Sequence, residues 1–320
     1  MKTVFVRTPC SEKNRIHLQE ACGKEYTFLF GQDYDRERDL EEMKRCQIIV
    51  GEPDYEDIRN LPQLEWVQMT WAGTDKYTKN GPFPDNVLLT NASGAFGVII
   101  SEYIIAGILS LYRRLPYYHE RQKEHNWCPL HHEETLFQKN VLILGAGNIG
   151  SETAKRLKAF DCQVYGIRRN PVKMPYFDQI ATVDCLDEWL GQADVVICCM
   201  PNNPDSMNLL TYDRLCRMKD SAIIVNVGRG HIFAENALEE VLIEGKIAGA
   251  VLDVQRTEPL NGSHPFWEMD QVILTPHIAG PSFSSTEDTQ DRIYEIVAEN
   301  LQRYAKGEDL RNLTLTNEKK

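Results

Sequence analysis

The chain has 320 residues, enough for two domains with sizeable cores, and its apolar content of 42% and charged content of 26% are those of an ordinary globular protein. Its formal net charge of −12 argues against nucleic acid or a membrane surface as the main partner, although one buried Arg can still bind a small anion. The nine cysteines follow no disulfide or zinc spacing, and neither a signal peptide nor a span-length apolar segment is visible, so we expect a cytoplasmic protein with reduced thiols.

The first part of the chain alternates short β-like runs with polar helical stretches, which is typical of a parallel sheet. The runs are Thr3–Val6, Thr27–Phe30, Gln47–Val50, Leu64–Met69 and Val87–Thr90. The apolar segment from Gly97 to Glu124 predicts one long helix that links two domains. The next loop, Asn126 to Lys139, holds the pair His131-His132, but no acid or Cys stands at a helical ligand spacing beside it. We therefore predict a surface loop and no metal site.

The second part shows a clearer alternation of strands and helices. A short apolar strand, Asn140–Leu144, precedes an amphipathic helix, Ile149–Phe160, and a second strand, Gln163–Ile167. Further runs are Val195–Met200, Ala222–Val227, Gly249–Val254 and Val272–Thr275, each after a helical stretch. This order predicts a doubly wound parallel sheet. The tail, Thr286 to Lys306, is expected to be one helix that returns to the first domain.

The turn Gly145-Ala146-Gly147-Asn148-Ile149-Gly150 fits the pattern G-x-G-x-x-G, follows a strand and opens a helix. That context makes an otherwise weak motif informative. Gly145 permits the tight turn, Gly147 lets the backbone approach a pyrophosphate, and Gly150 lets helix and strand pack closely. The helix N-terminus supplies free N–H groups for the phosphates. The turn therefore predicts a dinucleotide-binding unit.

The end of the second strand carries Arg168-Arg169, where a cofactor with a free ribose 2′-hydroxyl usually meets Asp or Glu. An acid would repel a 2′-phosphate, whereas guanidinium groups can clamp it bidentately. We therefore predict NADP as the preferred cofactor, with NAD possible. The alternative is that both arginines are solvated surface charges.

Three later strand ends carry groups suited to acid–base chemistry. Arg229 stands between two glycines after one strand, Asp253 ends the next and is followed by Glu258, and His277 follows the last. A 2-oxo acid needs a cation for its carboxylate and a proton donor for its carbonyl. A His, with an ordinary pKa of about 6.5, suits the second task, and a hydrogen-bonded carboxylate would orient its ring. Each residue alone is more often a surface charge or a packed loop residue, so the argument rests on the set.

With these motifs in place, the sequence resembles the D-isomer-specific 2-hydroxyacid dehydrogenase family, clearly from about Leu136 to Gly280 and more weakly on either side. The matching blocks are Gly145–Gly150, Pro201–Pro204, Met218–Gly230, Ala250–Val254, Glu258–Leu260 and Thr275–Gly280. Several long matches in one order are far more specific than any single motif.

The resemblance implies a role for each motif residue. Arg229 would bind the substrate carboxylate and polarise the carbonyl, and His277, paired with Glu258, would be the general acid in reduction and the base in oxidation. Asp253 would hold the nicotinamide carboxamide. The other residues implied to line the dinucleotide, besides Gly145, Gly147, Gly150, Arg168 and Arg169, are Asn148, Ile149, Pro201, Val227, Gly228 and Gly280.

The stretch Trp71-Ala72-Gly73 looks like the family's substrate loop, in which backbone N–H groups near Ala72 and Gly73 take the carboxylate. Trp71 is then either a wall that selects or stacks on the substrate side chain, or a core residue with no bearing on specificity. The resemblance leaves both interpretations open, and with them glyoxylate, hydroxypyruvate and bulkier 2-oxo acids.

We therefore predict an α/β protein with two Rossmann/flavodoxin-like doubly wound parallel-sheet domains and a cleft between them. The substrate-binding (catalytic) domain comprises 1–97 and 287–320, and the dinucleotide-binding domain spans 98–286. The predicted reaction is hydride transfer between NADP(H) and a 2-oxo acid or D-2-hydroxy acid, in a homodimer that acts as a reductase.

The main alternative is a dinucleotide-sensing binding module, like the corepressors that share this fold. The presence of Arg229, Glu258 and His277 favours an enzyme. Within the enzymes, formate dehydrogenases of the superfamily place Gln where Glu258 stands. Phosphoglycerate dehydrogenases are less favoured, because such chains often carry an extra domain and because only Lys76 and Lys79 stand beside the substrate loop.

Overall fold

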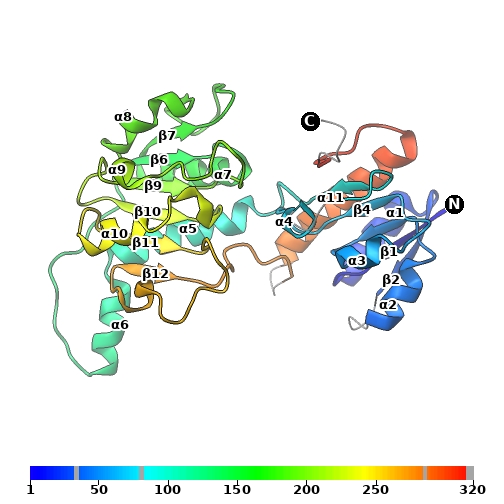
Figure 1. Cartoon of the computed structure of the whole chain (residues 1–320), viewed down its shortest axis with the longest axis horizontal. Helices are drawn as coiled ribbons and strands as arrows, with labels where there is room; N and C mark the ends of the chain where they lie inside the picture. Colours follow the sequence, from blue (N-terminus) through cyan, green and yellow to red (C-terminus); the bar gives the residue numbers. More distant parts are fainter. Residues whose placement is uncertain (32–35, 79–82, 284–286, 315–320) are drawn as a thin grey trace. The chain divides into compact units, whose positions relative to one another are not determined.

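The computed structural model describes residues 1–31, 36–78, 83–283 and 287–314. The chain forms two compact units, one made of Met1–Phe96 with Pro281–Lys320 and the other of Gly97–Gly280. The sequence predicted that the second unit spans residues 98–286. Each unit holds one fully parallel sheet with helices against it (Figure 1), so the predicted α/β class with two doubly wound sheets is confirmed.

The first unit contains a five-stranded sheet in the order β2-β1-β3-β4-β5. Its strands are β1 (Lys2–Val6), β2 (Tyr26–Phe30), β3 (Ile48–Val50), β4 (Trp66–Gln68) and β5 (Leu88–Thr90). Each of the five predicted runs overlaps a strand; β1 and β2 begin one residue before their runs, and β3, β4 and β5 are shorter than theirs. The strand order reverses between β1 and β3, and ligands of such sheets bind at the carboxyl ends of the strands near a reversal.

Helices cover both faces of this sheet. They are α1 (Glu12–Cys22), α2 (Arg36–Met43), α3 (Tyr55–Ile58), α4 (Asp75–Thr78) and α11 (Glu287–Lys306). The tail helix α11 returns to this unit and packs against α1, where the Cys22 thiol donates to the carbonyl oxygen of Ala298 at 3.7 Å. The predicted start of this helix, Thr286, lies outside the described residues.

The second unit contains a seven-stranded sheet in the order β12-β11-β10-β9-β6-β7-β8. Its strands are β6 (Asn140–Leu144), β7 (Gln163–Ile167), β8 (Gln179–Ala181), β9 (Val195–Cys198), β10 (Ile223–Asn226), β11 (Gly249–Leu252) and β12 (Val272–Leu274). The order reverses between β6 and β9, which is the dinucleotide-binding position of a Rossmann sheet. Both strands that flank this reversal were predicted.

Helices sandwich this second sheet as well. They are α5 (Gly97–Tyr112), α6 (Leu115–Lys123), α7 (Asn148–Leu157), α8 (Leu186–Leu190), α9 (Tyr212–Leu215) and α10 (Ala237–Ile243), with short 3-10 turns η1 (Lys158–Phe160), η2 (Val183–Cys185), η3 (Gly230–Ile232) and η4 (Pro265–Glu268). Helix α5 contacts β10 and β11, and a Cβ at Gly107 would lie 2.7 Å from Val251 Cγ1, so this glycine allows the helix to approach the sheet closely.

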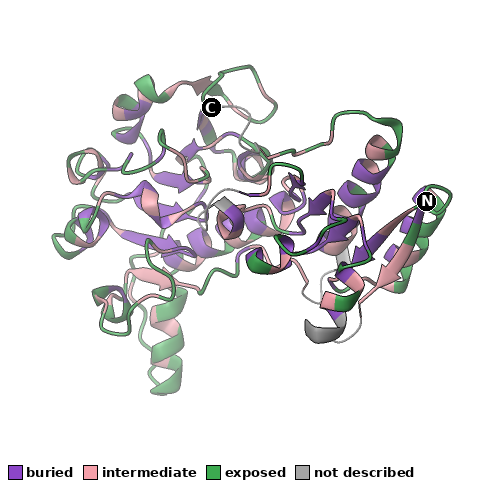
Figure 2. Ribbon diagram, turned by 45° about the vertical axis from the view of Figure 1, so that its right-hand side comes forward, coloured by how far each residue is buried: buried purple, intermediate pink, exposed green. Residues whose placement is uncertain are grey.

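The inner strands of both sheets are buried, as Figure 2 shows in purple, whereas the edge strands β2, β8 and β12 are largely half-buried. In the second sheet alternate side chains face opposite layers, as strand geometry requires. One layer joins strand residues to α8, α9 and α10; it includes Leu142, Leu144, Val196, Ile224, Leu252, Leu186, Leu215 and Leu238. Strands covered on both faces read as continuous apolar runs, which explains why the sequence predicted them well.

The structure corrects one predicted helix and adds one strand that was not predicted. The helix expected over Gly97–Glu124 is two helices, because Arg114 adopts a left-handed conformation (φ 54°) and Pro116 then occupies the first turn of α6. The edge strand β8 was not predicted, since its three residues, Gln179–Ala181, form too short an apolar run to stand out in the sequence. Among the described residues, no helix has both the length and the apolarity needed to span a bilayer.

Candidate active site

The glycine turn joins β6 to α7 at the reversal of the second sheet. Gly145 has φ +106°, and a Cβ there would lie 3.0 Å from the carbonyl carbon of Cys199 at the end of β9. A Cβ at Gly150 would lie 2.4 Å from the carbonyl oxygen of Gly145. At Gly147, by contrast, a Cβ would meet nothing within 4 Å. Two glycines are thus required by packing, whereas the third leaves open space at the start of α7, where Asn148 and Ile149 lie.

The two arginines after β7 differ in their surroundings. The carbonyl oxygen of Ile167, the last residue of β7, accepts the N–H groups of Gly145 and Ala146. Arg168, the next residue, therefore lies beside the glycine turn. The Arg168 side chain is half-buried and its Nη1 lies 2.9 Å from Met174 Sδ. Arg169 is exposed and forms an ion pair with Asp205 at 2.7 Å. Arg168 is therefore the better placed of the two to meet a group bound at the turn.

The loops after β9 and β10 complete this edge of the sheet. Pro201 follows β9, and Val227, whose N–H donates to the carbonyl oxygen of Cys198 at 3.1 Å, follows β10. The side-chain oxygen of Asn202 is buried without a hydrogen-bond donor among the described residues. An unpartnered acceptor is costly, so a bound donor would relieve it. Together with the open space at Gly147, this fits a dinucleotide with its hydroxyl and amide donors.

Arg229 is held between two points of very close backbone packing. A Cβ at Gly228 would lie 2.6 Å from the carbonyl oxygen of Met200, and one at Gly230 would lie 2.0 Å from the backbone of Gln255. No other residue fits either position. The arginine backbone is extended, and its Nη1 donates to the carbonyl oxygen of Gly228 at 2.7 Å. The guanidinium is therefore placed by the carboxyl end of β10.

His277 and Glu258 form a pair in the second unit. The imidazole Nδ1 lies 2.9 Å from Glu258 Oε2, and the other carboxylate oxygen accepts the N–H of Gln255 at 2.8 Å. The histidine side chain is 50% exposed, so its Nε2 edge can meet a ligand. His277 also has φ +56°, a strained conformation for a residue with a Cβ. Strain of this kind persists only where the surroundings enforce it, and it often marks a functional position.

Asp253 holds the backbone next to His277 in this conformation. It is buried; its Oδ1 accepts the Thr275 hydroxyl at 2.6 Å and the N–H of Ile278 at 2.8 Å, and its Oδ2 accepts the N–H of Ala279 at 2.9 Å. Because Thr275 gives its proton to Asp253, Tyr103 Oη must donate to Thr275 Oγ1 at 2.6 Å. Asp253 thus holds the loop that carries the histidine, a role that sequence reasoning had not assigned to it. Gly280 is the last residue of the second unit.

The loop Trp71–Gly73 lies at the carboxyl edge of the first unit's sheet. The Trp71 side chain is 44% exposed and is therefore not a core residue. The Trp71 carbonyl accepts the N–H of Ala92 at 2.9 Å, and the Ala72 carbonyl accepts Asn91 Nδ2 at 3.0 Å. Both carbonyls thus point into the unit.

Sequence reasoning missed three polar residues that support these loops. The buried Asn226 accepts the N–H of Gly228 through Oδ1 at 3.0 Å and donates from Nδ2 to the Arg229 carbonyl at 3.1 Å. Tyr103 acts through Thr275 as described. Glu52 is buried in the first unit, and burial raises the pKa of its carboxyl. Only Asn226 had a visible signal, a polar residue ending a buried strand.

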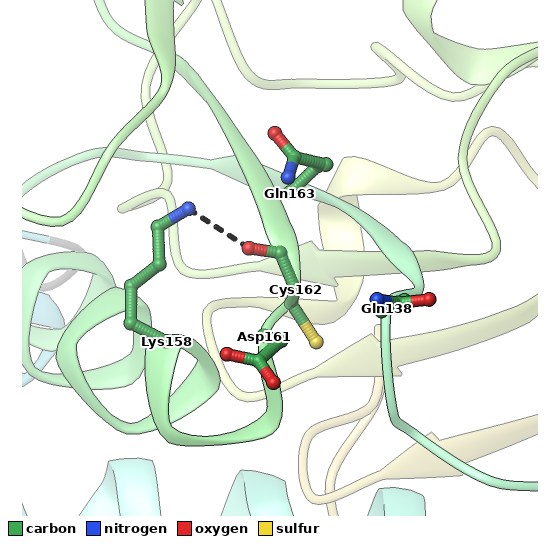
Figure 3. A pocket seen from close by; sticks show the side chains of 5 residues that line it. All are labelled: Gln138, Lys158, Asp161, Cys162 and Gln163. Atoms are coloured by element: carbon green, nitrogen blue, oxygen red, sulfur yellow. Dashed lines mark hydrogen bonds between the residues drawn. The ribbon is translucent and has the colours of Figure 1, made fainter.

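A cavity among the described residues lies away from this edge of the sheet. It has a volume of about 490 Å³ and is found at the amino ends of β6 and β7, the opposite end of these strands from the glycine turn (Figure 3). It is lined by Gln138, Lys158, Asp161, Cys162 and Gln163. In the described part of the chain no cluster of three or more His, Cys, Asp or Glu side chains could hold a metal ion, and His131 and His132 are exposed.

Comparison with known proteins gives one family. The family model described as D-isomer specific 2-hydroxyacid dehydrogenase, NAD binding domain, matches residues 105–279. The glyoxylate/hydroxypyruvate reductase A of Serratia proteamaculans is 31% identical over 72% of this chain and 75% of its own length. A D-3-phosphoglycerate dehydrogenase of Archaeoglobus fulgidus is 31% identical over 97% of this chain, which spans only 58% of that relative.

A solved structure agrees over both units. A D-isomer specific 2-hydroxyacid dehydrogenase family protein from Aeromonas salmonicida is 31% identical, with a TM-score of 0.88, and the match covers 99% of each chain. The names of these relatives do not favour a dinucleotide-sensing corepressor.

Proposed function

Because this chain belongs to the family of D-isomer specific 2-hydroxyacid dehydrogenases, which are oxidoreductases that use a nicotinamide dinucleotide, we propose that it reduces a small 2-oxo acid to its D-2-hydroxy acid with NADPH. The observation that carries the proposal is the pairing of His277 with Glu258 at 2.9 Å on a loop that Asp253 holds in a strained conformation. A binding module has no need of an oriented proton donor.

Each site residue has one task in this reaction. The dinucleotide, when bound, supplies the hydride to the carbonyl carbon. Arg229 binds the substrate carboxylate and polarises the carbonyl, and His277 gives its proton to the carbonyl oxygen. Glu258 orients the imidazole by their hydrogen bond. In the reverse direction His277 accepts the hydroxyl proton.

The dinucleotide would be held by the edge of the second sheet. Gly145, Gly147 and Gly150 form the turn for the pyrophosphate, with Asn148 and Ile149 at the N-terminus of α7. The other residues that we assign to the cofactor are Arg168, Arg169, Pro201, Val227, Gly228, Asp253 and Gly280. Asp253 already accepts three hydrogen bonds, yet a carboxylate has about four lone-pair sites, so one site is left for a carboxamide.

The direct test is oxidation of NADPH and of NADH in parallel, with glyoxylate, hydroxypyruvate, pyruvate, 2-oxoisovalerate and phenylpyruvate as substrates. We expect turnover with at least one acid and a preference for NADPH. The best substrate also tests Trp71, which we propose as the wall that selects the side chain. Cofactor binding without turnover of any acid would contradict the enzyme proposal.

NADP preference rests on Arg168. Replacing it with Asp puts a negative charge where the 2′-phosphate is expected and should lower the ratio of kcat/KM for NADPH to that for NADH by roughly tenfold or more. Arg169→Asp is the matched comparison, because Arg169 is exposed and already engaged by Asp205, so a smaller change is expected. An unchanged ratio in Arg168→Asp would rule out the clamp.

We further propose a homodimer that uses α6 and the loop after it. No residue of α6 is buried, Trp127 is 100% exposed, and Leu115 and Phe137 are more than half exposed. Aromatic side chains of this kind are typical anchors of interfaces. Light scattering should give twice the mass of one chain, and Trp127→Asp should shift it toward a single chain. A parent protein of single-chain mass would contradict this assembly.

The nine thiols are all free in the described residues, and we place the protein in a reducing compartment, the cytoplasm.

A further inference from the structure

A buried acid of the first unit, Glu52, has no part in the reaction described above. Glu52 follows β3 at the carboxyl edge of the sheet, next to the reversal between β1 and β3, and is only 8% exposed. Its Oε1 accepts the backbone N–H groups of Thr70 and Trp71 at 2.6 and 3.1 Å. The Thr70 hydroxyl lies 3.0 Å from Oε1 and 3.1 Å from Oε2. One carboxylate thus fixes two successive amides at the start of the loop Trp71–Gly73.

The rest of that loop is tied from the other side. The carbonyls of Trp71 and Ala72 accept hydrogen bonds from Ala92 and Asn91, as described above. A trans peptide is planar, so the N–H of each peptide points away from its carbonyl. The N–H of Ala72 must therefore point away from Ala92, and that of Gly73 away from Asn91. Within the described ranges, neither N–H donates to an acceptor of this chain. Two adjacent amides are left for an external anion.

Burying the Glu52 carboxyl costs solvation free energy. Burial raises the pKa of its carboxyl, whereas the N–H donors of Thr70 and Trp71 and the charge of Lys76 act in the opposite direction. The two cations nearby, Lys76 and Arg7, donate to the carbonyl oxygen of Glu52 at 2.9 Å each, rather than to its carboxylate. These cations are themselves paired, Lys76 with Asp54 and Arg7 with Asp39. The carboxylate is therefore committed to the loop and not to an ion pair.

We propose that Glu52 is a positioning residue for substrate recognition, because it fixes Thr70 and Trp71 so that the N–H groups of Ala72 and Gly73 are presented to the substrate carboxylate. This proposal rests on the proposed function, which makes the loop a substrate-binding element. Glu52 itself does not touch the substrate. An oxygen acceptor of the right reach, rather than a negative charge, is what the loop requires.

Variants of Glu52 that remove the acceptor oxygen, or that keep it and remove the charge, test this proposal. Glu52→Ala removes the acceptor and should raise KM for the 2-oxo acid roughly tenfold or more, with a smaller change in kcat, because the loop contact is made in the ground state as well as in the transition state. Glu52→Gln keeps an oxygen for both N–H groups and can donate to Thr70, so KM should stay within about threefold of the parent. Glu65→Ala, a carboxylate of the same unit paired with Lys2, is the control and should leave KM unchanged.

Hydrogen–deuterium exchange supplies a readout that does not need turnover. The peptide that spans residues 70–73 should exchange faster in Glu52→Ala and like the parent in Glu52→Gln. Should Glu52→Ala not fold, Glu52→Asp, whose carboxylate is one methylene short, carries the same expectations for KM and exchange. Equal KM in the parent and Glu52→Ala, or equal defects in the Gln and Ala variants, would overturn the proposal. A parent without turnover would instead contradict the proposed function, and the exchange data would still decide whether Glu52 fixes the loop.

Discussion

Replacing His277 with Gln is expected to lower kcat by roughly 10²–10⁴-fold, the usual contribution of a positioned general acid. Gln keeps the size and polarity of the side chain but cannot transfer a proton. The hydrogen bonds of Asp253 to Ile278 and Ala279 do not involve the imidazole, so the loop should keep its conformation. Steady-state NADPH oxidation and cofactor binding, measured on the same preparation, separate loss of chemistry from loss of structure.

The chain offers a matched control for this variant. His264 lies in the same unit and also faces a carboxylate, that of Glu239 at 3.7 Å, but it belongs to the loop before η4 and caps that turn. His264→Gln should therefore leave kcat within a few-fold of the parent. If His277→Gln retained parental kcat, another group would have to supply the proton and the site assignment would be wrong.

The sequence predicted most clearly those elements whose signal is local. Strand β6 is a five-residue run of which four residues are fully buried, and two of the glycines that follow it, Gly145 and Gly150, are required by close approaches of the backbone. Strand β8 carries Gln179 and lies at the edge of the sheet, so it needs no long apolar run and leaves none to find. The break between α5 and α6 was visible only as Pro116, which a helix tolerates in its first turn.

The parts of the site that sequence reasoning missed depend on contacts between distant residues. Glu52 and Thr70 are 18 positions apart, and Tyr103 and Thr275 are 172 apart, so no spacing rule relates them. Asp253 was identified, but as a ligand of the cofactor rather than as the acceptor that holds the histidine loop. The residues expected to act chemically were thus recognisable by type and motif, whereas those that position them became visible only in the fold.

The second large effect is expected from Arg229→Ala, which should lower kcat/KM by roughly 10²–10³-fold, with KM and kcat both affected. The guanidinium is proposed to bind the substrate carboxylate in the ground state and to stabilise the charge that develops on the carbonyl oxygen. Its backbone is fixed by Gly228, Gly230 and Asn226, so truncating the side chain should leave the turn intact.

Two comparisons make the Arg229 result specific. Arg214 lies on α9 of the same unit, and its Nε forms an ion pair with Asp187 at 2.8 Å. Arg214→Ala should leave kcat/KM near the parental value. Added guanidinium ion should restore part of the activity of Arg229→Ala, since it can occupy the vacated position, and should not help His277→Gln. Arg229→Lys should recover less than full activity, because a point charge cannot reproduce a planar fork of donors. Parental kinetics in Arg229→Ala would remove the cation from the mechanism and, with it, the reason to expect an anionic 2-oxo acid at this site.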